Sequence, residues 1–249
     1  MLESLRIQDF RCHCDTTVRF GRLTALVGPN GSGKSSVLEV FRALSAVAAD
    51  RQESLRIPMP CIRRSARRAQ LCVSLHMVNE APSSSDWVVV DERDHLRIRS
   101  EPEDQFDHLG LPTDGLSPNE RGLLANVHEF MIEPALVGAP ALLQDPDVSL
   151  DVTGANTAAV LAAIKIRDDA QFDRIGAMLR AVVPSIERLR VAPARIANQP
   201  AVGWEVHLDV RGVGTLPAST LSQGTRMTLA LVTALCAPSP PSIALFDEI

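Results

Sequence analysis

Residues 28–35 have the types and the spacing that hold phosphate groups. They read Gly-Pro-Asn-Gly-Ser-Gly-Lys-Ser, and their glycines let backbone N–H groups curl around phosphate oxygens. In such a loop Lys34 reaches the β- and γ-phosphates, and the Ser35 hydroxyl ligates Mg²⁺. The sequence therefore predicts a site for a nucleoside triphosphate and Mg²⁺, with further contacts from Asn30, Gly31, Ser32, Gly33 and Ser36.

The segments on both sides of this loop support the prediction. A buried strand is predicted before the loop, from Leu23, Ala25, Leu26 and Val27. A helix is predicted after it, from apolar residues at helical spacing: Val37, Leu38, Phe41, Leu44 and Ala48. The N-terminus of that helix would direct free N–H groups and partial positive charge at the phosphates. A glycine-rich turn that binds nothing is the competing interpretation, and it leaves this order of strand, loop and helix unexplained.

Two carboxylates follow a second apolar run near the C-terminus. Residues 243–246 predict a buried strand, and Asp247 and Glu248 come directly after it. Asp247 suits the Mg²⁺ shell, directly or through water, and Glu248 suits polarising the attacking water. Lys34 and Glu248 are therefore the candidate catalytic residues. Alone, the run could also be a strand that ends in a charged turn.

A third segment lies between these two. Residues 221–225 read Leu-Ser-Gln-Gly-Thr and precede an apolar helical pattern. Ser222 is a good N-cap, so that the segment alone could be a plain helix start. The interval to Asp247 has room for one helix, a proline-rich turn and a strand. Three such segments in this order are hard to obtain by chance.

Together the three segments resemble the ATP-binding-cassette ATPases and, within them, the RecF-like and chromosome-maintenance-like heads. Residues 9–13, Asp-Phe-Arg-Cys-His, are similar to the segment that opens such heads. Residues 150–156, Leu-Asp-Val-Thr-Gly-Ala-Asn, resemble a segment of bacterial predicted AAA-type ATPases related to the overcoming-lysogenisation-defect proteins. The resemblance covers nearly the whole chain and is specific at the three nucleotide motifs.

The resemblance implies an α/β fold of the P-loop NTPase class, a cassette-like head with a flanking antiparallel sheet and an inserted helical lobe. One head is expected over residues 1–249, with its core at about 1–80 and 188–249 and its lobe at about 81–187. Local patterns predict strands at 71–77 and 204–210, a hairpin formed by 88–90 and 96–98, and helices at 120–132, 157–166 and 171–182.

The resemblance also implies a mechanism that needs two heads. Ser222, Gln223 and Gly224 would contact the γ-phosphate of ATP held by the Lys34 loop of a second copy, so that ATP joins a homodimer. Arg11 is a candidate phosphate contact by the same resemblance, and its alternative is a solvated arginine at a strand end. ATP and Mg²⁺ are the cofactors that this mechanism implies.

The chain stops at Ile249, directly after the paired carboxylates, whereas cassette ATPases continue with further strands and a switch histidine. We therefore expect a truncated head that hydrolyses ATP weakly by itself. Gln70 and Gln105 are weak candidates for the magnesium ligand at the lobe hinge. One functional hypothesis is the ATPase head of a bacterial DNA-repair or phage-defence system. The alternative is a nucleotide-gated binding module without efficient hydrolysis, and a transporter subunit is a distant third.

Composition agrees with a head located in the cytoplasm. The chain has 249 residues and 45% apolar content, and no apolar run approaches the about 18 residues of a membrane span. Its five cysteines are scattered and odd in number, which is typical of reduced thiols. Cys12, His13 and Cys14 invite a metal hypothesis, but no second pair stands at ligand spacing.

DNA is a candidate partner. Residues 51–70 hold six arginines against one acidic residue, Glu53, and could contact a nucleic-acid backbone. The alternatives are a solvated loop or arginines paired with the acidic stretch at 86–120. The net charge of −5 does not favour nucleic acid.

Overall fold

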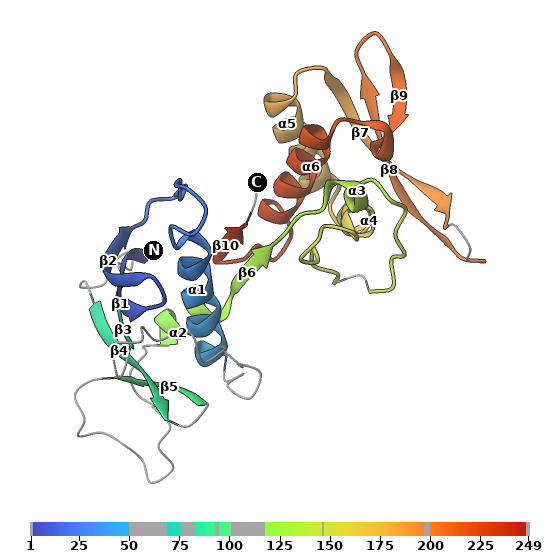
Figure 1. The fold of residues 1–249 in the computed structure, drawn as a ribbon. Helices are drawn as coiled ribbons and strands as arrows, with labels where there is room; N and C mark the ends of the chain where they lie inside the picture. The colour runs from blue at the N-terminus through green and yellow to red at the C-terminus, as the bar shows by residue number, and fades with distance from the viewer. Residues whose placement is uncertain are drawn as a thin grey trace. The chain divides into compact units, whose positions relative to one another are not determined.

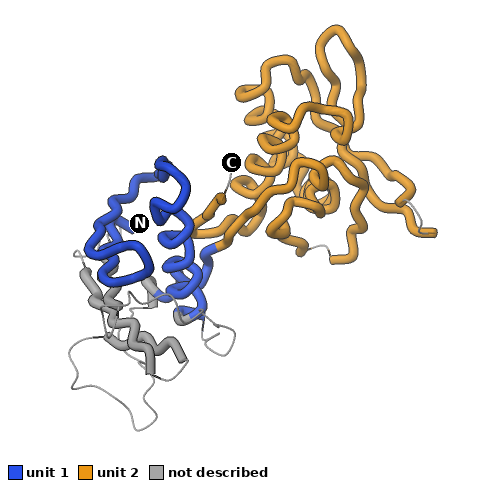
Figure 2. Tube along the Cα trace, viewed as in Figure 1, with its two compact units in different colours: residues 1–127 blue, residues 128–249 orange. Residues whose placement is uncertain are grey.

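The structure, a computed structural model, describes residues 2–49, 69–75, 83–92, 95–100, 118–145, 147–196 and 200–247. The chain divides into two units, residues 1–127 and residues 128–249 (Figure 2). This division does not test the predicted core and inserted lobe, which stay a prediction. Each unit is described by itself.

Alternating apolar residues build the sheet of the first unit. In the N-terminal strand, Leu5 and Ile7 are fully buried while Arg6 between them is exposed. The five strands are antiparallel, in the spatial order β2-β1-β3-β4-β5 (Figure 1). They are β1 (Leu2–Phe10), β2 (His13–Arg19), β3 (Ala69–Leu75), β4 (Ser83–Glu92) and β5 (His95–Ser100). The flanking antiparallel sheet and the hairpin formed by β4 and β5 are thus as predicted.

Two helices complete the first unit, α1 (Lys34–Ala48) and α2 (Pro118–Ala125). The apolar stripe of α1 is buried, and the ring of Phe41 meets that of Phe20 edge to face at 5.4 Å. Leu124 of α2 is fully buried, and α2 packs against α1. These contacts fix α1 along its length, which in turn fixes the position of its N-terminus.

The predicted strand before the phosphate loop is not formed. Residues 24–29 have no regular secondary structure, and Leu23 and Val27 are 92% and 93% exposed. A short strand needs a neighbour for its backbone N–H and C=O groups. No strand of the described residues pairs with this segment.

The second unit contains helices packed on a three-stranded antiparallel sheet, β7-β8-β9. Its strands are β6 (Val127–Phe130), β7 (Ile186–Arg195), β8 (Val202–Val210), β9 (Gly214–Pro217) and β10 (Ile243–Phe246). Its helices are α3 (Pro134–Val137), α4 (Thr157–Arg167), α5 (Asp169–Val182), the 3₁₀ helix η3 (Ala218–Thr220) and α6 (Gln223–Leu235). The helices predicted at 157–166 and 171–182 and the strand at 204–210 are confirmed.

The helix predicted at 120–132 is wrong in its second half. Helix α2 ends at Ala125, and Val127–Phe130 forms strand β6, which neighbours β10 in a two-stranded sheet. The ring of Phe130 stacks on that of Phe246 at 5.1 Å, and Phe130 is buried. Pairing and burial of this aromatic residue outweigh the helical pattern, as is usual for short segments.

Helix α4 is the centre of the core of the second unit. Eight consecutive residues, 157–164, are buried, as expected of a helix that is apolar all round. It contacts α5, α6 and the strands β7 and β8. Leu208 of β8 and Leu229 of α6 are fully buried in the same core.

We expect Leu208→Ala to lower the free energy of unfolding by about 3 kcal/mol, because it removes a buried side chain and leaves a cavity. Urea denaturation followed by circular dichroism measures this change. Leu235→Ala is the matched control, since Leu235 is 52% exposed and should change stability little. An equal effect of the two substitutions would contradict the position of Leu208 in the core.

The loop before α4 is held by its own polar side chains. Oδ1 of Asp151 accepts hydrogen bonds from Thr153 Oγ1 and from the N–H of Ala155, each at 3.0 Å. The Asn156 side chain accepts from the N–H of Asp151 and donates to the carbonyl of Ser149, at 3.0 and 2.8 Å. The same turn is tied to the chain after β6, since the carbonyls of Val152 and Thr153 accept the N–H groups of Met131 and Glu133 at 2.8 and 2.9 Å.

Candidate nucleotide-binding site

The phosphate loop turns on its glycines. Gly31 and Gly33 have φ angles of 78° and 95°, a region that residues with side chains rarely adopt. The N–H of Ser32 donates to the carbonyl of Pro29 at 3.2 Å, which closes the turn. Helix α1 begins at Lys34, so that the first N–H groups of the helix have no partner within it. This end of α1 can therefore bind an anion.

Lys34 lies over this loop. Its Nζ donates to the carbonyls of Gly28 and Pro29, at 2.9 Å each. The Ser35 side chain is exposed, as a magnesium ligand would need, whereas Ser36 is 7% exposed. A contact between Ser36 and a phosphate would therefore come from its backbone N–H. Asn30 and the loop residues Gly31 and Ser32 are exposed.

The turn between β1 and β2 contacts this loop and α1. Nη2 of Arg11 lies 2.6 Å from Oε1 of Glu39, on α1, and the two side chains are 31% and 22% exposed. Arg11 is therefore paired, and is not the solvated strand-end arginine of the alternative interpretation. Nε2 of the buried His13 lies 3.1 Å from the carbonyl oxygen of Gly33. Neither Glu39 nor the His13 contact was predicted from the sequence.

The predicted partner segment begins helix α6. The Ser222 Oγ accepts a hydrogen bond from the N–H of Thr225 at 3.2 Å, so Ser222 is the N-cap. Gln223 and Gly224 are exposed. A Cβ added to Gly224 would meet no atom within 4 Å. Glycine destabilises a helix relative to alanine, and nothing in the fold of this unit requires a glycine at position 224.

Asp247 follows strand β10 directly. Its N–H donates to the carbonyl of Phe130 at 3.2 Å, and its side chain is half-buried. Glu248, Gln105 and most of the arginine-rich stretch 51–70 lie outside the described residues, and the side chain of Gln70 is not described either. Within the first unit the turn that carries Arg11 contacts Gly33 of the loop through His13, while Arg11 itself pairs with Glu39; the second unit holds residues 222–224 and Asp247. Their roles in binding and catalysis stay predictions.

Comparison with known proteins finds similarity to ATPases over part of the chain. Residues 1–101 match the family model of the AAA ATPase domain. The resemblance to ATPase heads is confirmed. An OLD nuclease of Thermus scotoductus (strain ATCC 700910 / SA-01) is 43% identical over 72 residues, which are 28% of this chain and 13% of that protein.

Solved structures agree on the fold. The crystal structure of an SmcHead bound to the C-winged helix domain of ScpA superposes with a TM-score of 0.54 at 16% identity, over 94% of this chain and 76% of that one. A structure of the recombination mediator protein RecF gives a TM-score of 0.49 at 12% identity, over 100% of this chain and 85% of that one. The superposition with the SmcHead and the match to the AAA ATPase domain confirm the predicted P-loop ATPase fold, with mixed α and β structure.

Among the residues that the structure describes, no group of three or more His, Cys, Asp or Glu side chains could hold a metal ion. His13, instead, is hydrogen-bonded on both ring nitrogens. Within the same part of the chain, no helix is long and apolar enough to cross a membrane.

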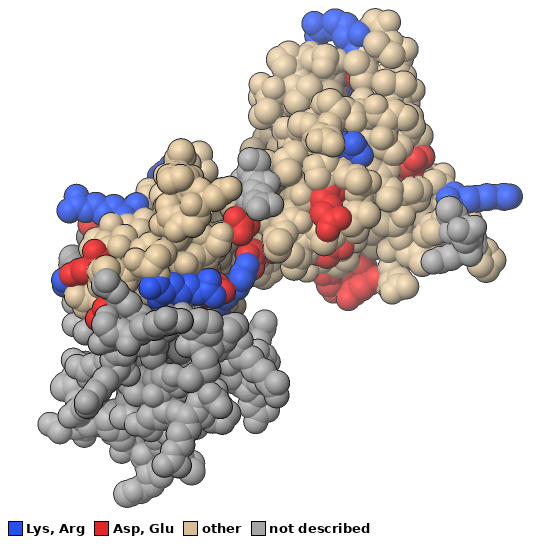
Figure 3. Space-filling model, viewed as in Figure 1, with Lys and Arg blue, Asp and Glu red and all other residues tan. Residues whose placement is uncertain are grey.

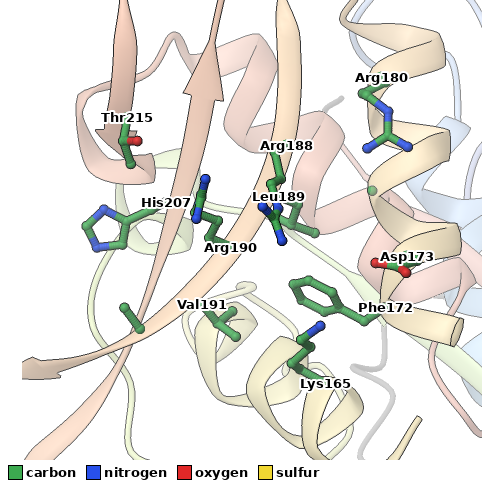
Figure 4. Close-up of a pocket in the computed structure, with 12 residues that line it drawn as sticks. Lys165, Phe172, Asp173, Arg180, Arg188, Leu189, Arg190, Val191, His207 and Thr215 are labelled. Atoms are coloured by element: carbon green, nitrogen blue, oxygen red, sulfur yellow. The ribbon is translucent and has the colours of Figure 1, made fainter. Parts of the chain in front are cut away.

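On the face that Figure 3 shows, lysines and arginines of the described residues lie singly or in small groups, some of them beside acidic side chains, and form no broad basic surface there. The second unit has a pocket of about 450 Å³ beside α5 and β7. Arg180, Arg188, Arg190 and Lys165 all line it (Figure 4). These side chains give this cavity a basic lining.

Ion pairs neutralise much of the charge in this pocket. Arg190 lies 2.7 Å from Asp209 and, through its hydrogen bond, holds the pKa of that carboxyl below its usual range. Lys165 is paired with Asp169 on the next helix. Arg180 and Arg188 remain without an ion pair among the described residues, while Asp173 adds a negative charge to the lining. The phosphate loop is therefore the stronger candidate for an anion site.

Proposed function

We propose that this chain is the ATP-binding part of a head that dimerises around ATP and hydrolyses it. The observation that carries the proposal is the phosphate loop itself, two positive-φ glycines directly before a helix that begins at Lys34. The match of residues 1–101 to the AAA ATPase domain supports it. Mg²⁺ and ATP are the cofactors.

The polar side chains of the site have separate roles in this proposal. Bound phosphates would replace the carbonyls of Gly28 and Pro29 as acceptors for Lys34, which exchanges two neutral acceptors for charged ones. The exposed hydroxyl of Ser35 and the carboxylate of Asp247 are oxygen donors of the kind that Mg²⁺ prefers. When bound, Mg²⁺ would neutralise charge on the phosphates. Glu248 would polarise the attacking water.

In this proposal the second copy of the chain contacts the nucleotide with the start of its helix α6. Ser222, Gln223 and Gly224 would approach the γ-phosphate held by the loop of the partner. Gly224 supports this role, because no packing within its own unit explains a glycine there. A glycine permits a second backbone or a phosphate to come close. The dimer would therefore form only when ATP is bound.

The setting that we propose is a bacterial DNA-repair or phage-defence system in the cytoplasm, with DNA as a candidate partner. The names of the similar proteins, a recombination mediator and an OLD nuclease, are the basis for this. The alternative is a nucleotide-gated module in which ATP drives association without efficient hydrolysis.

One experiment tests both versions. The purified chain is studied with and without MgATP, with its mass distribution measured by mass photometry and phosphate release measured in the same sample. A dimer with Mg²⁺-dependent phosphate release supports the ATPase, and a dimer without release supports the gated module. A chain that stays monomeric and releases no phosphate, although ATP is saturating, overturns the proposal.

A further inference from the structure

The turn between β1 and β2 has an unusual backbone. Asp9 and Arg11 have φ angles of 54° and 52°, the left-handed region in which residues with side chains are uncommon. Such conformations persist where the surrounding contacts hold them, and they concentrate at functional sites. The contacts that hold this turn lead to the phosphate loop and to α1.

The first contact is made by His13. A carbonyl oxygen can only accept a hydrogen bond, so Nε2 of His13 must carry the proton that it donates to Gly33, at 3.1 Å. The other ring nitrogen, Nδ1, lies 3.1 Å from the hydroxyl of Thr16, which fixes the ring from behind. The Gly33 carbonyl also accepts the N–H of Val37 at 3.2 Å, so His13 occupies its second lone pair.

The consequence for the loop follows from peptide geometry. The carbonyl of Gly33 and the N–H of Lys34 belong to one planar trans peptide, and they point in opposite directions. Holding the carbonyl toward His13 therefore directs the N–H of Lys34 away from the turn. The Lys34 N–H is one of the free donors at the start of α1.

The turn also packs on the loop without space between them. A Cβ added to Gly33 would lie 2.5 Å from Nε2 of His13 and 2.6 Å from Sγ of Cys12. Its φ of 95° excludes other residues as well. The second anchor is the ion pair of Arg11 with Glu39, about one and a half turns along α1 from Lys34. The turn is thus fixed both to the loop and to the helix that follows.

We propose that the β1–β2 turn is a clamp that orients the phosphate loop, with His13 and Glu39 as positioning residues. His13 acts through the Gly33 carbonyl, and Glu39 acts through Arg11. The proposal rests on the proposed function, because it names what prepares that same loop for a triphosphate. Neither residue touches the nucleotide itself.

Two amide substitutions at His13 test the clamp, with affinity for a fluorescent ATP analogue as the readout. His13→Gln keeps an N–H donor near the position of Nε2, and His13→Asn has the same amide on a side chain one methylene shorter. We expect His13→Asn to weaken binding about tenfold, the effect of one lost hydrogen bond, and His13→Gln to stay within about threefold of the original chain. Equal affinities of the two variants would overturn the role of the hydrogen bond.

Glu39→Ala is expected to weaken binding about fivefold, because Arg11 loses its anchor and the turn loosens. Asp15→Ala is the matched control, since it removes a carboxylate of the same hairpin that pairs with Arg6 at 2.6 Å and not with Arg11. Thermal unfolding of each variant separates lost folding from lost binding. Unchanged affinity in Glu39→Ala would overturn the second anchor.

The outcomes distinguish the clamp from the function on which it rests. If the original chain does not bind the ATP analogue, the proposed function fails. If the original chain binds it and His13→Asn and Glu39→Ala bind equally well, the clamp fails and the proposed function stands.

Discussion

Replacement of Lys34 by alanine is expected to weaken ATP binding by about a hundredfold, the largest effect of any single substitution in the loop. The ammonium group is the only cation that the loop itself supplies, and its Nζ already lies over the carbonyls of Gly28 and Pro29. Without it the phosphates would be held by backbone N–H groups alone. Titration of a fluorescent ATP analogue measures the loss.

The chain supplies its own control. It has two lysines, Lys34 and Lys165, and Lys165 lies on α4, paired with Asp169. Lys165→Ala removes the same charge and should leave ATP binding unchanged. Comparable losses in both variants would mean that net charge, and not the phosphate loop, governs binding.

Glu248→Gln is expected to give the second largest effect, an ATP-bound dimer that persists. The amide keeps the size of the carboxylate but cannot accept the proton of the attacking water, so phosphate release should fall by about a hundredfold or more. Binding by the loop is unaffected, and ATP then holds the two copies together. Gel filtration in MgATP measures the dimer.

A second substitution shows whether the dimer uses the start of α6. Gly224→Asp, added to Glu248→Gln, would place a carboxylate where the γ-phosphate of the partner is expected, and repulsion should abolish the dimer. Gly224 has open space around it, so the fold of its own unit should tolerate the change. A Glu248→Gln chain that remains monomeric at saturating MgATP would rule out the two-head mechanism.

Much of this architecture could be predicted from the sequence, because it is encoded locally. The glycines of the loop, the apolar spacing of α1 and the alternation in β8 each constrain a short segment, and all three are formed as predicted. Ser222 was predicted both as a cap and as a partner contact. Its cap geometry is observed, and its partner contact still needs the dimer experiment.

The observed secondary structure differs from the prediction where contacts with a distant segment determine the local conformation. Residues 23–27 have the composition of a strand, but a strand needs a neighbour, which a pattern within five residues does not specify. Residues 127–130 look helical until Phe130 meets Phe246, more than a hundred residues away. The contact of His13 with Gly33 also joins residues that are distant in the sequence, and no local pattern at either position predicts it. The cysteines on both sides of His13, Cys12 and Cys14, suggest a metal site instead of this contact.

The turn at residues 149–157 joins two segments of the second unit. Its side chains bond to its own backbone and to one another, which fixes its shape before α4. The carbonyls of Val152 and Thr153 also accept the N–H groups of Met131 and Glu133, at 2.8 and 2.9 Å. Loosening this one turn would therefore release both the start of α4 and the chain that follows β6.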